Sequence, residues 1–209
     1  MQNNLISGNL YNFGASGHND VDVSNLVDEK PIYYLIGESD IIIDSSSNAG
    51  TVYCINCDNI TIYDLILKNN CHGIYFYNTN SSQAKNNQIV DCENGIYIES
   101  SSSNIISKNY ANDNEWYGID IYESSNSTIT NNNVGSNNYN GIFLYSSSNN
   151  SITNNNASGN NYNGITLSSS GNSTITNNNV SSNNYNGIIL YFELNTPQLA
   201  AVGMVKKTT

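Results

Sequence analysis

The sequence predicts an all-β fold: a right-handed parallel β-helix with coils of 22–23 residues and three short strands per coil. The first observation behind this prediction is a repeat, because glycine returns at a fixed spacing and isoleucine follows it each time. A period of this length is typical of solenoids. The glycines are Gly73, Gly95, Gly118, Gly141, Gly164 and Gly187.

The second observation is a set of apolar columns. When each glycine is counted as position zero, positions +1, +3, +11 and +16 are apolar in nearly every coil. Positions +1 and +3 alternate with polar or aromatic +2 and +4, which is the period of a strand, and helical spacing is missing. Strands are therefore expected near +1 to +4, +10 to +12 and +16. The +1 column is Val52, Ile74, Ile96, Ile119, Ile142, Ile165 and Ile188.

Asparagine and serine fill the predicted corners between strands. Asparagine tolerates the left-handed backbone conformation and bonds its own backbone, so it suits tight corners. At position +14 it recurs in five successive coils, where stacked sheets favour an amide ladder. The expected ladder is Asn87, Asn109, Asn132, Asn155 and Asn178.

The pattern divides the chain into three parts. Residues 50–191 are the predicted β-helix, and residues 1–49 form an irregular N-terminal region. Because this region begins within a coil, we expect further sequence before it. Residues 192–209 abandon the repeat and are expected to be a tail or a cap, since terminal repeats are atypical.

Composition excludes several partners. The net charge is −11, with six Lys against 17 acids, so nucleic-acid binding is not expected. The sequence contains no run of about 18 apolar residues, so membrane insertion is not predicted. Cys54 and Cys57 have the spacing of half a zinc knuckle, but no second pair follows. With Cys71 and Cys92 they are expected to be core or free thiols, and no metal or cofactor is predicted.

Two repeat units, NNNVGSNNYNGIFLYSSSNNSIT and NNNASGNNYNGITLSSSGNSTIT, resemble NosD-type parallel β-helix repeats. Nearly all of residues 1–191 shares this resemblance. It implies a secreted, multidomain parent of the kind found among cell-surface and S-layer-associated proteins of methanogenic archaea, and therefore an extracellular location. The NosD label also implies copper delivery, yet only His18, His72 and two Met are present to supply such a site.

Outward aromatic residues favour a binding surface as the main functional hypothesis. Rings with free faces would suit surface glycans or other cell-surface proteins, although stacked rings can also merely stabilise the ladder. We therefore expect an extracellular structural or binding module without catalysis. The candidate residues are Tyr75, Tyr97, Tyr122, Phe143 and Tyr145, with a second column of Trp116, Tyr139, Tyr162 and Tyr185.

The alternative hypothesis is a hydrolase or lyase that acts on polysaccharides. Its candidate catalytic residues are Glu99, Asp120 and Glu123, because glycoside hydrolysis needs two nearby carboxyl groups. The chain has no Arg, and His72 lies two coils from the acids, so solvated acids without catalysis are the favoured interpretation. A more remote alternative is ice binding by a flat hydroxyl array such as Thr128 and Thr130.

Overall fold

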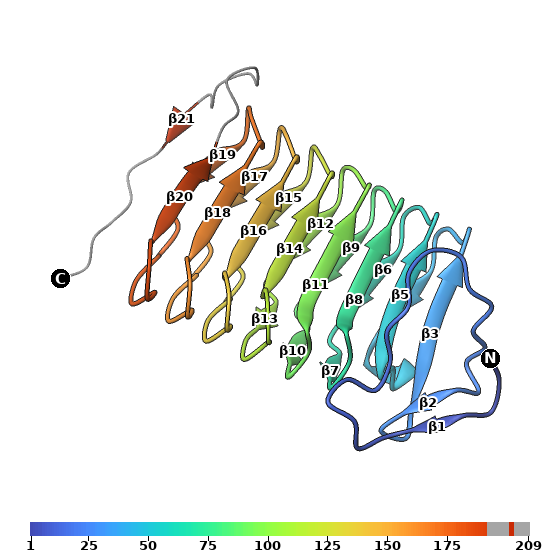
Figure 1. Cartoon of the computed structure of the whole chain (residues 1–209). Helices are drawn as coiled ribbons and strands as arrows, with labels where there is room; N and C mark the ends of the chain where they lie inside the picture. The colour runs from blue at the N-terminus through green and yellow to red at the C-terminus, as the bar shows by residue number, and fades with distance from the viewer. Residues whose placement is uncertain (192–200, 203–209) are drawn as a thin grey trace.

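The chain winds into a parallel β-helix, as the sequence predicts (Figure 1). The computed structural model describes residues 1–191 and the backbone of residues 201–202. Within this part, three sheets run along the helix axis, and all strand pairs are parallel except β2 with β3. Apart from β21, the predicted tail or cap at residues 192–209 lies outside the described residues.

The sheets differ in length. The long sheet contains, in spatial order, β1 (Leu5–Ile6), β2 (Leu26–Val27), β3 (Lys30–Ile36), β5 (Thr51–Ile55), β8 (His72–Tyr77), β11 (Asn94–Glu99), β14 (Ile119–Tyr122), β16 (Ile142–Tyr145), β18 (Ile165–Ser168) and β20 (Ile188–Tyr191). The second sheet contains β21 (Ala201–Val202), β19 (Thr174–Thr176), β17 (Ser151–Thr153), β15 (Thr128–Thr130), β12 (Ile105–Ser107), β9 (Gln83–Lys85), β6 (Thr61–Tyr63) and β4 (Ile42–Ile43). The third contains β13 (Tyr110–Ala111), β10 (Gln88–Val90) and β7 (Ile66–Lys68), and a short 3-10 helix spans Ser45–Ser47.

The predicted +1 column forms the centre of the core. Six of its seven members, from Val52 to Ile165, are fully buried, and Ile188 packs against them from the last described coil. The amide ladder is also confirmed, since the first four of its five members each donate from Nδ2 to the Oδ1 of the next coil, as from Asn109 to Asn132 at 3.1 Å. Apolar columns and buried amide ladders therefore join successive coils.

The repeated glycine is required by close approach between coils. A Cβ atom on Gly95 would lie 2.5 Å from the carbonyl oxygen of Gly118, and one on Gly118 would lie 2.9 Å from the carbonyl oxygen of Gly141. Neither backbone can give way, so a side chain is excluded there. At another corner, Asn126 and Asn149 have φ values of 57° and 59°, as expected for asparagine in tight turns.

Candidate functional site

Six outward side chains gather on the long sheet around β8, β11 and β14. The register aligns Tyr75 with Tyr97 and Tyr97 with Asp120, and it sets Glu99 two residues further along β11. The other two members come from the residues just before the repeated glycines. We call these six residues the acid–aromatic cluster: His72, Tyr75, Tyr97, Glu99, Tyr117 and Asp120.

Glu99 is held by a phenol. The hydroxyl of Tyr75 donates a hydrogen bond of 2.6 Å to Oε2 of Glu99. Tyr75 is only 1% exposed, and its ring stacks on Tyr97 at 5.2 Å between centroids. Burial, together with Glu99, raises the pKa of Tyr75 far above its usual value, so the phenol keeps its proton and Glu99 accepts from it. This contact fixes one carboxylate oxygen on the outer face.

Asp120 lies in a less polar environment than Glu99. Its side chain is 8% exposed, and Oδ1 is buried without a hydrogen-bond partner. Burial, assisted by the nearby negative charge of Glu99, raises the pKa of Asp120 to about 8. The carboxyl group is therefore mostly protonated at neutral pH, and the expectation of a solvated acid is wrong for Asp120.

His72 contacts the aromatic rings of the cluster, one coil before Glu99 and two coils before Asp120. Its ring centroid is 5.0 Å from that of Tyr97 and 5.2 Å from that of Tyr75. Nδ1 is buried without a partner, and burial lowers the pKa of His72 to about 4, so the imidazole is neutral at pH 7. The expected separation of two coils holds for Asp120, whereas Glu99 is one coil away.

Tyr117 forms the downstream boundary of the cluster and was not predicted from the sequence. Its ring stacks on Phe143 at 5.0 Å, and its backbone N–H donates to Oδ1 of Asn94 at 3.3 Å. Burial and the proximity of Asp120 raise the pKa of Tyr117. Tyr117, His72 and Asn94 each stand directly before a repeated glycine, and this shared position is the sequence signal that links the three residues.

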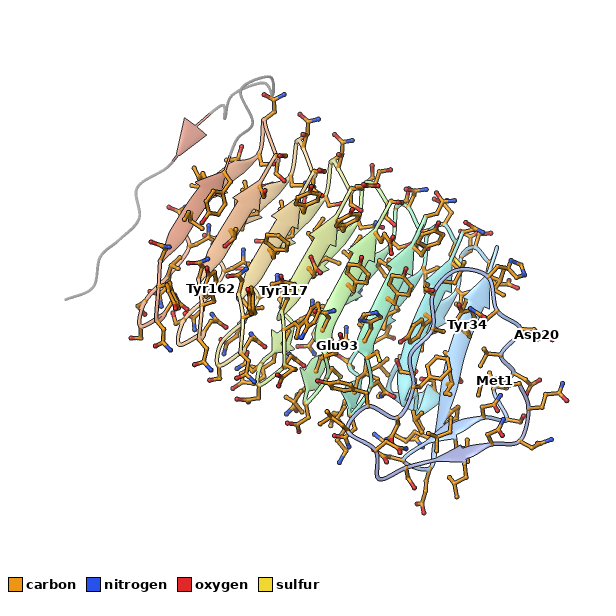
Figure 2. All side chains as sticks on the ribbon, in the orientation of Figure 1. Met1, Asp20, Tyr34, Glu93, Tyr117 and Tyr162 are labelled. Atoms are coloured by element: carbon orange, nitrogen blue, oxygen red, sulfur yellow. The ribbon has the colours of Figure 1, made fainter. Side chains whose placement is uncertain are left out.

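An N-terminal cover, residues 12–21, closes the upstream end of this face. Phe13 meets the ring of Tyr53 edge-on at 5.2 Å, and the hydroxyl of Tyr34 donates to the carbonyl oxygen of Gly17. The blue N-terminal segment crosses in front of β3 and β5 in Figure 1. Figure 2 labels Tyr34 and Tyr117, which mark the covered and the open parts of the face.

The remaining predicted residues lie outside the cluster. Glu123 is exposed at the corner after β14, where its φ is 48°, so the three proposed acids do not form one group. Tyr122 and Tyr145 stack on each other at 5.3 Å along the outer edge of the sheet. Only Glu99 and Asp120 are therefore brought together as a carboxyl pair.

Neighbouring tyrosine rings of the second aromatic column contact one another. Tyr139 stacks on Tyr162 at 4.9 Å, and Tyr162 lies 4.4 Å from Tyr185. Trp116, at the upstream end, is half exposed. The stacked faces of Tyr139 and Tyr162 are turned to each other, while Tyr139 and Tyr185 remain 46% and 68% exposed.

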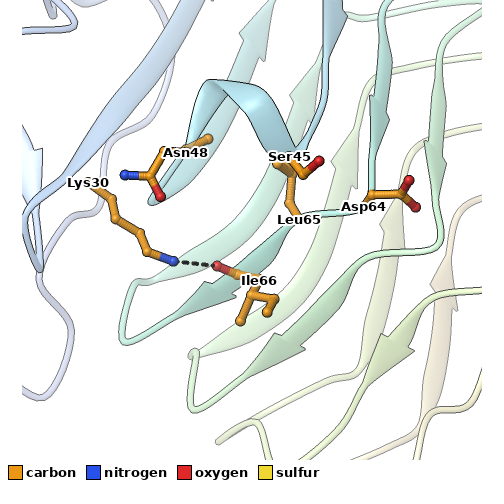
Figure 3. A pocket seen from close by; sticks show the side chains of 7 residues that line it. Lys30, Ser45, Asn48, Asp64, Leu65 and Ile66 are labelled. Carbon is orange, nitrogen blue, oxygen red and sulfur yellow. Dashed lines mark hydrogen bonds between the residues drawn. The ribbon is translucent and has the colours of Figure 1, made fainter.

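The cysteines and other hollows do not extend the site. All four cysteines are free thiols, and burial raises the pKa of Cys54. Residues 1–191 contain no group of three or more His, Cys, Asp or Glu placed to hold a metal ion. In Figure 3 a separate hollow between the third sheet and the start of β3 is occupied by Lys30, whose Nζ donates to the carbonyl oxygen of Ile66 at 3.2 Å. No helix in the described chain is long and apolar enough to span a membrane.

Comparison with protein families gives one match. The family described as right handed beta helix region matches residues 50–197, more than half of the chain. This match confirms the predicted handedness and covers the predicted β-helix of residues 50–191. No significant match was found among curated proteins.

Solved structures of similar fold are enzymes that act on polysaccharides. A variant of the periplasmic alginate epimerase AlgG has a TM-score of 0.67 and 20% identity, over 78% of this chain and 39% of the epimerase. The A-module of a mannuronan C-5 epimerase from Azotobacter vinelandii has a TM-score of 0.61 and 15% identity, over 88% and 57%. The enzymatically active domain of tailspike protein 2 from bacteriophage CBA120 has a TM-score of 0.56 and 16% identity, over 85% and 30%.

These neighbours overturn the expectation of a module without catalysis. Each is named for an enzymatic activity or an enzymatically active domain, whereas the sequence had favoured a structural or binding role. The chain spans less than two thirds of each of these structures. At such identities the likeness shows the fold, and the activity of this chain has to be argued from its own residues.

Proposed function

The chain belongs to the right-handed β-helix region family, and we propose that it is a polysaccharide-acting enzyme whose reacting groups are Asp120 and Glu99. The observation that supports this most directly is the buried carboxyl of Asp120, whose pKa is raised to about 8 beside a second carboxyl group. Strongly raised pKa values with a stated charge partner are typical of catalytic acids.

The two carboxyl groups suit glycosidic cleavage. Protonated Asp120 donates its proton to the glycosidic oxygen as the bond from that oxygen to the anomeric carbon breaks. Glu99 stabilises the positive charge at that carbon, either by bonding to it or by deprotonating the water that attacks it. A strand spacing of about 4.8 Å and a rise of about 3.3 Å per residue put the two Cα atoms about 8 Å apart. Glycosidases that retain the configuration hold their two carboxyl groups about 5–5.5 Å apart, and those that invert it hold them about 6.5–9.5 Å apart.

A second candidate reaction is proton abstraction at C5 of a uronate, by elimination or epimerisation. Its support is the neutral imidazole of His72, whose buried Nδ1 has no partner and can accept a proton. The resemblance to two epimerases is consistent with it. This reaction gives unsaturated products or an inverted C5, whereas hydrolysis gives new reducing ends.

The proposal is tested by product analysis on a panel of polysaccharides. We expect wild type to release new reducing ends. We expect the rate to fall by about 10²-fold or more in Asp120→Asn and in Glu99→Gln. Glu123→Gln is the matched control, because this exposed acid lies at the neighbouring corner. Absence of every product, or equal rates for wild type and Asp120→Asn, would overturn the proposal.

We further propose that the enzyme works outside the cytoplasm on glycans. The NosD-type resemblance of the repeats supports an archaeal cell-surface setting, and the AlgG epimerase is described as periplasmic. Immunodetection in fractionated source cells would test the location, and recovery of the protein only from the cytoplasm would contradict it.

A further inference from the structure

The charges around the acid–aromatic cluster are one-sided. The sequence has no Arg, and the four Lys of residues 1–191 lie away from the outer face of β8, β11 and β14. Lys30 is bound to the carbonyl oxygen of Ile66, and Lys68 lies in the third sheet. Lys85 is in the second sheet, over the ring of Tyr63, and Lys108 follows β12 at a corner of that sheet.

Acidic groups, in contrast, border the cluster. Glu99 and Asp120 lie within it. After burial, Glu99 raises the pKa of Tyr97, and Asp120 adds to this effect once it has lost its own proton. Glu123 at one corner likewise raises the pKa of Tyr122. At the opposite corner Glu93 and Glu115 raise the pKa of Tyr11 after burial. The electrostatic potential at the face is therefore negative, and a polyanion would be repelled from it.

The lack of cations on this face also disfavours proton abstraction at C5 of a uronate. Abstraction of the C5 proton places negative charge next to the sugar carboxylate, so an enzyme needs cations or free donors there. Within residues 1–191 no Lys or Arg lies on this face, so only neutral donors could meet that need. Hydrolysis of a glycosidic bond between neutral sugars has no such requirement, because it needs only an acid that protonates the leaving oxygen and a carboxylate.

We propose that the acid–aromatic cluster acts on an uncharged polysaccharide and cleaves it by hydrolysis. This inference rests on the proposed function and specifies its substrate class. Two polar atoms of the cluster, Nδ1 of His72 and Oδ1 of Asp120, are buried beneath this face without a hydrogen-bond partner. The half-buried rings of Tyr97 and Tyr117 offer apolar surface to a pyranose.

Matched polymer pairs test the substrate class. A polyuronate and the same polymer after chemical reduction of its carboxylates share linkage and length and differ in charge alone. Mannuronan and galacturonan are compared with their reduced forms, alongside a panel of neutral glucans, mannans, xylans and galactans. Retention in affinity electrophoresis is measured with Asp120→Asn, so that binding is read without turnover. Hydrolysis is measured with wild type.

We expect at least ten-fold tighter retention of uncharged polymers than of their charged partners, and reducing ends from uncharged polymers alone. Discrimination by Asp120→Asn without hydrolysis by wild type would support the substrate class and overturn the proposed reaction. Unsaturated or C5-inverted products from a native polyuronate would uphold an enzyme and overturn the uncharged substrate. Equal retention of both partners, or retention of none of the uncharged polymers, would also overturn it.

A charge variant sharpens the result. Tyr145 is 37% exposed and pairs with Tyr122 on the edge of the same face, so Tyr145→Lys adds a cation there. We expect this variant to raise retention of the native polyuronates several-fold and to leave the reduced polymers unchanged. Thr176→Lys, on β19 of the second sheet, adds the same charge to another face and should change neither. Equal effects of the two variants would contradict a local electrostatic origin.

Discussion

The coils before and after Tyr122 share one backbone and differ on their outer face. Downstream, the residues that precede the glycines bond to one another: Asn186 donates to Oδ1 of Asn163 at 3.0 Å, and Asn163 donates to Thr166 at 3.2 Å. Upstream, the equivalent positions hold His72, Asn94 and Tyr117. Regular repeats therefore satisfy their own polar groups, whereas the departure at His72 leaves a buried nitrogen without a partner.

Unpartnered buried polar atoms make this difference concrete. Within the described residues, the buried side-chain atoms without a hydrogen-bond partner all lie at or before residue 120. Three of them, on Tyr53, His72 and Asp120, belong to the outer face of the long sheet. An unpaired buried polar group costs stability. These atoms therefore lower the stability of the upstream face, as is common at functional sites.

The largest expected effect concerns the core that both regions share. Ile142→Asp places a carboxyl group without a partner in the fully buried +1 column. We expect the free energy of unfolding to fall by roughly 4 kcal/mol or more, as measured by chemical denaturation. Ser146→Asp, at an exposed corner of the same coil, should change it by less than about 0.5 kcal/mol. Similar effects of the two variants would show that the column is not core.

A smaller, pH-dependent effect is expected upstream. The folded pKa of Asp120, about 8, lies above its ordinary 3.8, so folded protein holds the proton and loses this stabilisation as pH rises through 8. Asp120→Asn has no such proton. Relative to wild type, the variant should therefore gain about 2 kcal/mol between pH 6 and 8, as read from denaturation at each pH. A constant difference between the two proteins would contradict the raised pKa.

The smallest predicted effect compares the two regions directly. His72→Phe removes an unpartnered nitrogen and should stabilise the protein by about 1 kcal/mol. Asn163→Leu removes the hydrogen bonds of its side chain to Thr166 and Asn186 and should destabilise the protein by about 1–3 kcal/mol. The opposite signs are measured by thermal unfolding at pH 7. Loss of stability in both variants would remove the distinction between the regions.

The fold was predictable because its signal is periodic. Every coil repeats the inward positions and the close-packed glycine, so residues such as Ile142 and Gly118 could be assigned from spacing alone. The carboxyl pair was partly predictable, since the register places Glu99 and Asp120 on one face. The burial of Asp120 was not, because it depends on how several neighbouring rings pack. The contacts of His72 with two tyrosine rings were not predictable, because side-chain packing between coils is not contained in the period.

The central claim is that Asp120 holds a proton at neutral pH in a reacting site. Its carboxyl carbon can be followed directly by ¹³C NMR titration, with Asp120→Asn used to assign the resonance. We predict a titration midpoint of about 8. A midpoint near the ordinary aspartate value of 3.8 would contradict the account.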